Sequence, residues 1–139
     1  MIMDIKALIL TLNTQRATEY AAAIQYYQHR AMLTGNEVAF QDMLDEHASD
    51  ELKHAGMLLN QITYLGGVVS VDIAKIYTAS DSIQMLRQDK QTEQEAIEAY
   101  TALYGMCMEL QQFGTANVIL DILQDENEHY NDLQSILKI

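Results

Sequence analysis

The chain has 139 residues, a length typical of one domain that buries its own hydrophobic core. Twenty acidic and eight basic side chains give a net charge of −12, which argues against nucleic acid binding, because neutralising phosphates requires a basic surface. Proline is absent, glycine occurs six times and cysteine once, so the composition favours an all-helical fold and excludes an internal disulfide framework.

The first half of the chain is predicted to form a helical hairpin. Residues 4–33 contain no helix breaker, and their apolar side chains recur at helical spacing. Gly35 suits a left-handed helix stop, and Asn36 suits the N-cap of a second helix. We expect that second helix to continue to about residue 65 and to end at Gly66.

The second half is predicted to form another hairpin after an irregular connection. Residues 68–79 are rich in β-branched side chains and lack a helical period. Ser80 or Asp81 suits the N-cap of a third helix. We expect Gly114 to stop this helix and Thr115 to cap a fourth one, which runs to the C-terminus.

The lengths of the connections set the predicted topology. Short turns join antiparallel helices, so each half is a hairpin. A helix of about 30 residues spans ~45 Å, and about 14 extended residues reach about as far. The second and third helices therefore lie parallel. The prediction is an all-α antiparallel four-helix bundle with one long crossover between helices 2 and 3, in a single domain covering residues 1–139.

The pattern Asp-Glu-x-x-His occurs twice and pairs Glu51 with His54 and Glu126 with His129. Residues i and i+3 share one face of a helix, so each pair can bind one metal ion. Both pairs lie on the apolar, inward stripe of their helix, where an unpaired carboxylate is costly. We therefore interpret them as metal ligands rather than as surface salt bridges.

A two-metal site in such a bundle needs one glutamate from each of the other two helices. The first helix offers Glu19. On the third, Glu93 shares its face with apolar side chains, whereas Glu95 and Glu98 share theirs with polar residues, so we choose Glu93. The candidate catalytic and metal-binding residues are Glu19, Glu51, His54, Glu93, Glu126 and His129.

These residues form an internal repeat of two hairpins. The two candidate glutamates of each half are 32 or 33 residues apart, and Tyr26 and Tyr100 each follow the first of them by seven. The second half is less regular, because Glu93 lies 21 residues before Gly114 but Glu126 only 12 after it. The third helix is therefore expected to bend or to end early.

The chemistry of the ligands favours iron or manganese over structural zinc, because each metal receives several oxygen ligands and one imidazole. Two divalent ions would also neutralise four carboxylates. Asp50 and Asp125 either orient the cluster from outside it or lie on the surface. Glu46 and His47 are interpreted as solvated, with an iron site on an inner surface as the alternative.

On these motifs the chain resembles the bacterioferritins of the ferritin-like superfamily. The specific parts are Glu19 with Ile24 and Tyr26, both Asp-Glu-x-x-His motifs, and the Met-Leu-Arg-x-Asp stretch of residues 85–89 that leads to Glu93. The resemblance implies a ferroxidase with two iron ions per subunit, which oxidises Fe(II) with O₂ or H₂O₂ and stores ferric iron in an oligomeric cage.

Two departures from the family pattern change what the resemblance implies. Leu52 stands where haem-binding members carry Met, which argues against haem ligation of that kind. The chain ends ten residues after His129, so the family's usual short fifth helix has no residues to form it. We therefore expect a homo-oligomer of the short form, with a dodecamer favoured over a 24-mer or a dimer.

Two other functions remain open from the sequence. One is a di-iron peroxidase that resembles rubrerythrin and has no storage cage; the other is a metal-free helical interaction protein. No apolar run approaches the ~18 residues of a membrane span, and a basic, cleavable leader is not recognisable. We expect no membrane partner and a cytoplasmic location.

Overall fold

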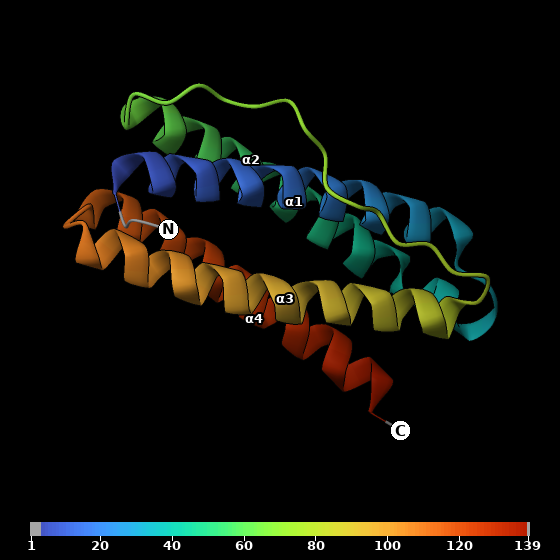
Figure 1. Ribbon diagram of the computed structural model, residues 1–139. Helices are drawn as coiled ribbons and strands as arrows, with labels where there is room; N and C mark the ends of the chain where they lie inside the picture. Colours follow the sequence, from blue (N-terminus) through green and yellow to red (C-terminus); the bar gives the residue numbers. More distant parts are fainter. Residues whose placement is uncertain (1–3, 139) are drawn as a thin grey trace.

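The computed structural model describes residues 4–138, which form two helical hairpins. In Figure 1, α2 (Gln41–Tyr64) and α3 (Ser82–Glu109) run in the same direction and are joined by the long crossover, which confirms the predicted all-α four-helix bundle. None of the helices in the described range is long and apolar enough to cross a membrane. The elements are α1 (Ile5–Met32), the short 3-10 helix η1 (Gly35–Phe40), α2 (Gln41–Tyr64), α3 (Ser82–Glu109) and α4 (Phe113–Leu137).

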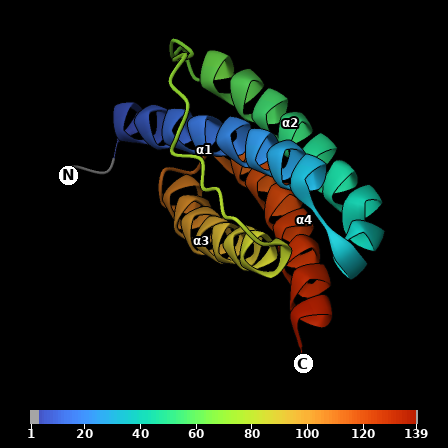
Figure 2. The same cartoon turned by 90° about the vertical axis from the view of Figure 1, so that its right-hand side faces the viewer.

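The crossover between α2 and α3 has no regular secondary structure, and polar side chains of α1 hold it in position by hydrogen bonds. In Figure 2 the crossover runs along the outside of α1. The buried guanidinium of Arg16 donates to the Ser70 hydroxyl at 2.8 Å and to the Asp72 carbonyl at 2.6 Å. The Asn13 side-chain amide donates to the Val68 carbonyl at 2.9 Å. These bonds satisfy backbone groups that the irregular segment would otherwise leave unpaired.

The turn between α3 and α4 differs from the prediction. Gly114 does not stop α3, which ends at Glu109, five residues before it; Gly114 lies in the first turn of α4. The left-handed residue is Gln111, with φ +57°. The Gln112 N–H donates to the Cys107 carbonyl at 2.8 Å, and this bond offsets the steric cost of the left-handed conformation at a residue other than glycine. Gly35 has the positive φ that the sequence predicted.

The early end of α3 nearly equalises the distances of Glu93 and Glu126 from the turn between α3 and α4, which the sequence had left unequal. Measured from Gln111, Glu93 lies 18 residues before the turn and Glu126 lies 15 after it. The mismatch falls from nine residues to three, or about 4.5 Å of helix rise. The helix therefore brings the two glutamates to nearly the same height by ending early.

Two predicted N-caps are wrong and one is confirmed. Thr115 does not cap α4, because its buried hydroxyl donates instead to the Gln61 side chain at 2.8 Å. Asn36 lies inside η1, and α2 starts only after that segment. Of the two predicted candidates, Ser80 and Asp81, it is the Asp81 side chain that caps α3, accepting from the Gln84 N–H at 3.0 Å.

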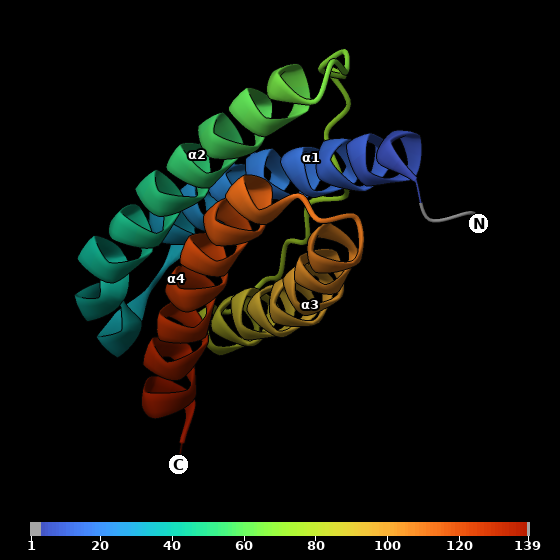
Figure 3. The same ribbon diagram turned by 90° about the vertical axis from the view of Figure 1, so that its left-hand side faces the viewer.

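One glutamate on each helix occupies a core position. Seven residues before and after each of these glutamates, the chain places a fully buried apolar or aromatic side chain. Figure 3 looks along the bundle from its other end and shows α2 and α4 beside each other. The four series, all buried, are Leu12–Glu19–Tyr26, Leu44–Glu51–Leu58, Leu86–Glu93–Tyr100 and Ile119–Glu126–Leu133.

Arg16→Ala should lower the free energy of unfolding by about 2–3 kcal/mol, because two hydrogen bonds from a buried charged donor are lost. Chemical denaturation measures this, and hydrogen exchange should rise in the crossover. Arg30→Ala is the control, because it breaks only an ion pair in which both side chains are about 40% exposed, worth less than about 1 kcal/mol. Equal losses in the two variants would contradict the anchoring role of Arg16.

Candidate metal centre

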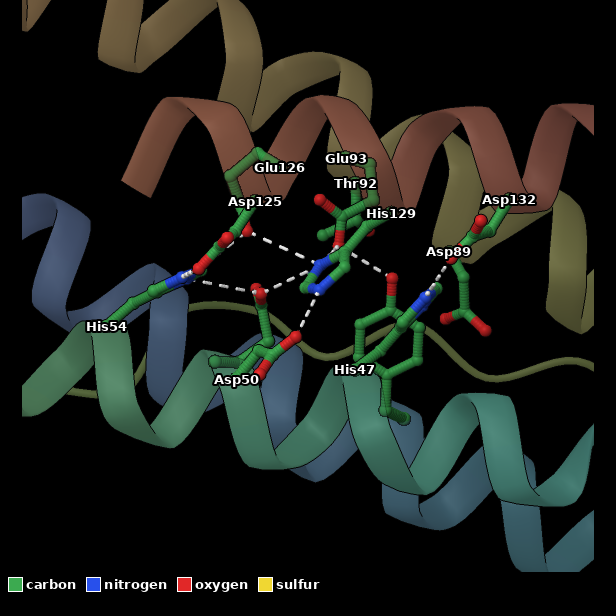
Figure 4. Close-up of polar contacts among 12 residues, drawn as sticks. His47, Asp50, His54, Asp89, Thr92, Glu93, Asp125, Glu126, His129 and Asp132 are labelled. Carbon is green, nitrogen blue, oxygen red and sulfur yellow. Dashed lines mark hydrogen bonds and ion pairs between the residues drawn. The ribbon is translucent and has the colours of Figure 1, made fainter. Parts of the chain in front are cut away.

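The six side chains singled out in the sequence meet in the middle of the bundle, and all are buried. Figure 4 shows His54 on α2 and His129 on α4 facing the carboxylates between them. The ligand atoms form two overlapping groups, within each of which all atoms lie within 4.8 Å of one another. Glu51 and Glu126 belong to both groups. The groups are Glu19, Glu51, His54 and Glu126, and Glu51, Glu93, Glu126 and His129.

The cluster contains buried polar atoms that have no hydrogen-bond partner. The Nδ1 atom of His54 lies 3.3–3.5 Å from three carboxylates but makes no hydrogen bond of good geometry. Buried polar atoms are normally satisfied, so their concentration at one place fits a site for cations. The unpartnered cluster atoms are Glu19 Oε2, Glu51 Oε1, His54 Nδ1, Glu93 Oε2 and both carboxylate oxygens of Glu126.

Two aspartates fix the histidine rings from outside the cluster. Nε2 of His54 donates to Asp125 at 2.8 Å, and Nε2 of His129 donates to Asp50 at 2.9 Å. An ionised carboxylate only accepts, so each Nε2 carries a proton, and Nδ1 of a neutral ring presents its lone pair to the cluster. Asp50 and Asp125 were expected either to orient the cluster or to lie on the surface. They do both, because the two side chains hold the histidine rings and are also partly exposed.

Two tyrosines bridge the hairpins through the outer glutamates. Tyr26 in the first hairpin donates to Glu93 at 2.6 Å, and Tyr100 in the second donates to Glu19 at 2.5 Å. Each bond occupies Oε1 of its glutamate, and Oε2 of both glutamates is buried without a hydrogen-bond partner. The tyrosines therefore orient these two carboxylates, and each hydroxyl stabilises the negative charge of its glutamate with one hydrogen bond.

The pKa shifts show how the cluster balances charge with protons. Burial raises the pKa of Glu51, and the carboxylates of Glu19 and Glu93 raise it further; burial and the same kind of repulsion raise the pKa of Glu126. Burial opposes a charged ring at His129, but the hydrogen bond to Glu93 and the other carboxylates outweigh it and raise its pKa to about 9. A metal ion must displace these protons to bind.

His47 and Asp132 were not recognised as neighbours of the cluster. His47 was expected to be solvated, but it is only 3% exposed, stacks on His129 with ring centroids 4.0 Å apart, and pairs with Asp132 through Nε2 at 3.1 Å. Glu46 is exposed, as expected. The available signal was spacing, because His47 precedes Glu51 by four residues and so shares its inward face.

A second buried histidine–carboxyl pair lies beside the cluster and was also not identified. His29 on α1 contacts Asp89 on α3 at 2.8 Å through Nδ1, and its Nε2 lies 2.9 Å from the carbonyl oxygen of Tyr77 in the crossover. The Gln25 amide donates to the same aspartate at 3.0 Å. This network ties three segments together one helical turn from Glu93.

The comparisons with known proteins agree with the fold and the site. A family model described as a ferritin-like domain matches residues 9–139, so the chain belongs to the ferritin-like family. It is 27% identical to a bacterial ferritin of Neisseria meningitidis over 96% of this chain and 88% of that protein. It is 30% identical to a bacterioferritin of Desulfovibrio desulfuricans over 96% of this chain and 76% of that protein.

Two solved structures are similar along nearly the whole chain. A ferritin-like di-iron-carboxylate protein from Bacillus anthracis matches with a TM-score of 0.93 and 30% identity, covering 99% of each chain. A dodecameric thioferritin from Bacteroides fragilis, described as bacterioferritin-related, matches with a TM-score of 0.90 and 29% identity, covering 97% of this chain and 86% of that one. The chain is thus a ferritin-like four-helix protein with a buried Glu/His site suited to two metal ions.

The raised pKa values make the stability of the metal-free protein depend on pH. A group with a higher pKa in the folded state stabilises the fold below its unfolded value, and this stabilisation is lost as pH rises through the folded value. For His129 the window runs from pH 6.5 to about 9. We expect the Tm of the metal-free protein, followed by circular dichroism, to fall across this window.

A divalent metal should remove this fall, because the ions then neutralise the carboxylates in place of protons. The control is the variant with Glu51→Gln and Glu126→Gln, whose Tm should vary less with pH because two buried ionisable groups are gone. A Tm of the metal-free wild type that stays constant or rises between pH 6.5 and 9 would contradict the raised pKa of His129 in the folded protein.

Proposed function

We propose that this chain is a ferroxidase that binds two Fe(II) ions per subunit, oxidises them with O₂ or H₂O₂, and stores the ferric product in an oligomeric cage. The observation that carries this proposal is the pair of overlapping ligand groups that share Glu51 and Glu126. Two ions held side by side can together supply the two electrons that reduce peroxide to water.

Each ligand has a distinct role in this proposal. Glu19 and His54 bind one ion, Glu93 and His129 bind the other, and the two shared glutamates bridge the pair. Several carboxylate oxygens and one imidazole per ion suit iron, as the sequence indicated. The fit is supported by the unpartnered buried oxygens, since two divalent ions neutralise four carboxylates.

The side chains around the ligands prepare the site before iron arrives. Asp50 and Asp125 keep the Nε2 protons on the histidines, so that Nδ1 is the nitrogen that binds metal once the ion displaces its proton. Tyr26 and Tyr100 hold the outer glutamates in place. The net charge of −12 favours the approach of Fe(II). A haem group is not part of the proposal, since Leu52 offers no sulfur ligand.

Glu51→Ala combined with His129→Ala should reduce Fe(II) oxidation to the rate in buffer alone, because a bridging ligand and the only imidazole of one position are lost. Absorbance of the ferric product measures the rate, and far-ultraviolet circular dichroism should show unchanged helix content. The variant can gain stability, because buried charges disappear. Glu95→Ala with Glu98→Ala, both exposed, is the matched control and should keep the wild-type rate. Wild-type oxidation by the double ligand variant would refute the assignment.

For the cage, we propose twelve subunits. The Bacteroides fragilis relative is described as dodecameric and covers almost this whole chain, which supports the same assembly here. Light scattering should give a particle of about twelve times the 15.8 kDa chain mass that retains ferric iron after gel filtration. A dimer that turns over peroxide and retains no mineral would instead favour the rubrerythrin-like peroxidase.

A further inference from the structure

A network of buried side chains joins α1, α3 and the crossover near the start of α3. Oδ1 of Asp89 accepts from the Gln25 side-chain amide at 3.0 Å and lies 2.8 Å from Nδ1 of His29. None of these three residues is more than 2% exposed. Water cannot replace a lost bond at such a depth, so the three side chains depend on one another for their hydrogen bonds.

The network holds one residue of the crossover by its backbone. The Tyr77 N–H donates to Oε1 of Gln25 at 2.9 Å, and the Tyr77 carbonyl oxygen lies 2.9 Å from Nε2 of His29. Gln25 and His29 thus bind both backbone groups of Tyr77, and Asp89 holds Gln25 and His29. We call Gln25, His29 and Asp89 the crossover clamp.

The crossover clamp needs a proton between His29 and Asp89. Both ring nitrogens of His29 face oxygen atoms, the Asp89 carboxyl group at Nδ1 and the Tyr77 carbonyl at Nε2. A carbonyl oxygen only accepts, so Nε2 carries one proton, and a second lies between Nδ1 and Oδ1. The carboxyl group of Asp89 is therefore what keeps His29 bound to α3 and to the crossover at once.

The crossover clamp and the metal centre use adjacent residues on the same two helices. On α1, Gln25 precedes Tyr26, whose hydroxyl donates to Glu93 at 2.6 Å. On α3, the Gln25 amide also donates at 3.1 Å to the hydroxyl of Thr92, the neighbour of Glu93. Asp89 lies one helical turn before Glu93. A shift of α3 relative to α1 therefore changes the bonds of the clamp and the position of Glu93 together.

The other half of the internal repeat has no such clamp. Counterparts in α1 and α3 lie 74 residues apart, as Glu19 and Glu93 do. Leu103, the counterpart of His29, is fully buried in an apolar cluster. Packing of the hairpins thus does not require a buried polar network, which costs more than an apolar side chain at the same place. The counterparts of Gln25, His29 and Asp89 are Ala99, Leu103 and Gln15.

We propose that Asp89 and His29 are positioning residues that couple the Glu93–His129 metal position to the crossover. Glu93 is fixed when it binds a metal ion, and with it the spacing of α1 and α3 at which the crossover clamp holds Tyr77. Coupling is reciprocal, so opening the clamp weakens metal binding at this position by the same factor. The Glu19–His54 position has no clamp and is unaffected. This inference rests on the proposed two-metal function.

Hydrogen exchange of the Tyr77 amide in the full-length protein tests the coupling, because this N–H is bonded to Gln25. Two Co(II) per chain should slow its exchange in wild type about tenfold, measured by mass spectrometry. Asp89→Asn should exchange faster and lose the response to Co(II), because one amide atom cannot both accept from Gln25 and donate to His29. His29→Leu with Asp89→Gln, which copies the other half of the repeat at two positions, should behave alike.

Co(II) titration followed by visible absorbance gives the second measurement. Asp89→Asn should weaken the binding of one Co(II) about tenfold and leave the other unchanged. Glu98→Gln is the matched control for charge, because it removes one exposed negative charge from α3, and it should keep the wild-type exchange and affinities. Arg16→Ala loosens the crossover at Ser70 and Asp72 and should leave the Co(II) response of Tyr77 intact.

Four results would overturn the coupling. They are Tyr77 exchange in wild type that ignores Co(II), a Co(II) response that persists in both clamp variants, Co(II) affinities unchanged in both clamp variants, or the same losses in Glu98→Gln. A wild-type chain that binds fewer than two Co(II) would refute the proposed two-metal function as well. Two bound ions together with any of the four results would refute the coupling only.

Discussion

The burial of four glutamates at one level of the bundle is the constraint on which the rest of the structure depends. Each glutamate takes a core position between apolar side chains seven residues away, where an unpaired carboxylate is strongly disfavoured. The surrounding groups all reduce this cost. Two tyrosines donate to the outer glutamates, two histidines face all four, and the remaining unpartnered oxygens point to cations as the missing partners.

The site also determines how the hairpins are held together. Tyr26 and Tyr100 each donate to a glutamate of the other hairpin, and each aspartate of a repeated motif accepts from the histidine of the other motif. These bonds cross the interface between the halves in both directions. The same contacts therefore align the ligands and fix the register of the hairpins, so that the fold and the proposed chemistry depend on the same side chains.

The features that depend on hydrophobic periodicity and residue spacing were predicted correctly from the sequence. Predictions failed at positions where tertiary contacts override local sequence preferences. The apolar periodicity predicted the helices, and the lengths of the connections predicted the crossover. The six candidate ligands were chosen because they lie on core-facing positions of their helices. The turn after α3 did not, because hydrogen bonds let Gln111 take the left-handed conformation that a glycine was expected to supply. Thr115 bonds to Gln61 across the bundle instead of capping α4, and the burial of His47 depends on a distant partner, Asp132.

The most direct test of the account is anomalous diffraction at the iron edge from crystals soaked with Fe(II) without oxygen. The account predicts two iron peaks per chain about 4 Å apart, one beside Glu19 and His54 and the other beside Glu93 and His129. The two carboxylates shared between the ligand groups should bridge them. A single peak, or no peak among the buried glutamates, would contradict a two-metal centre.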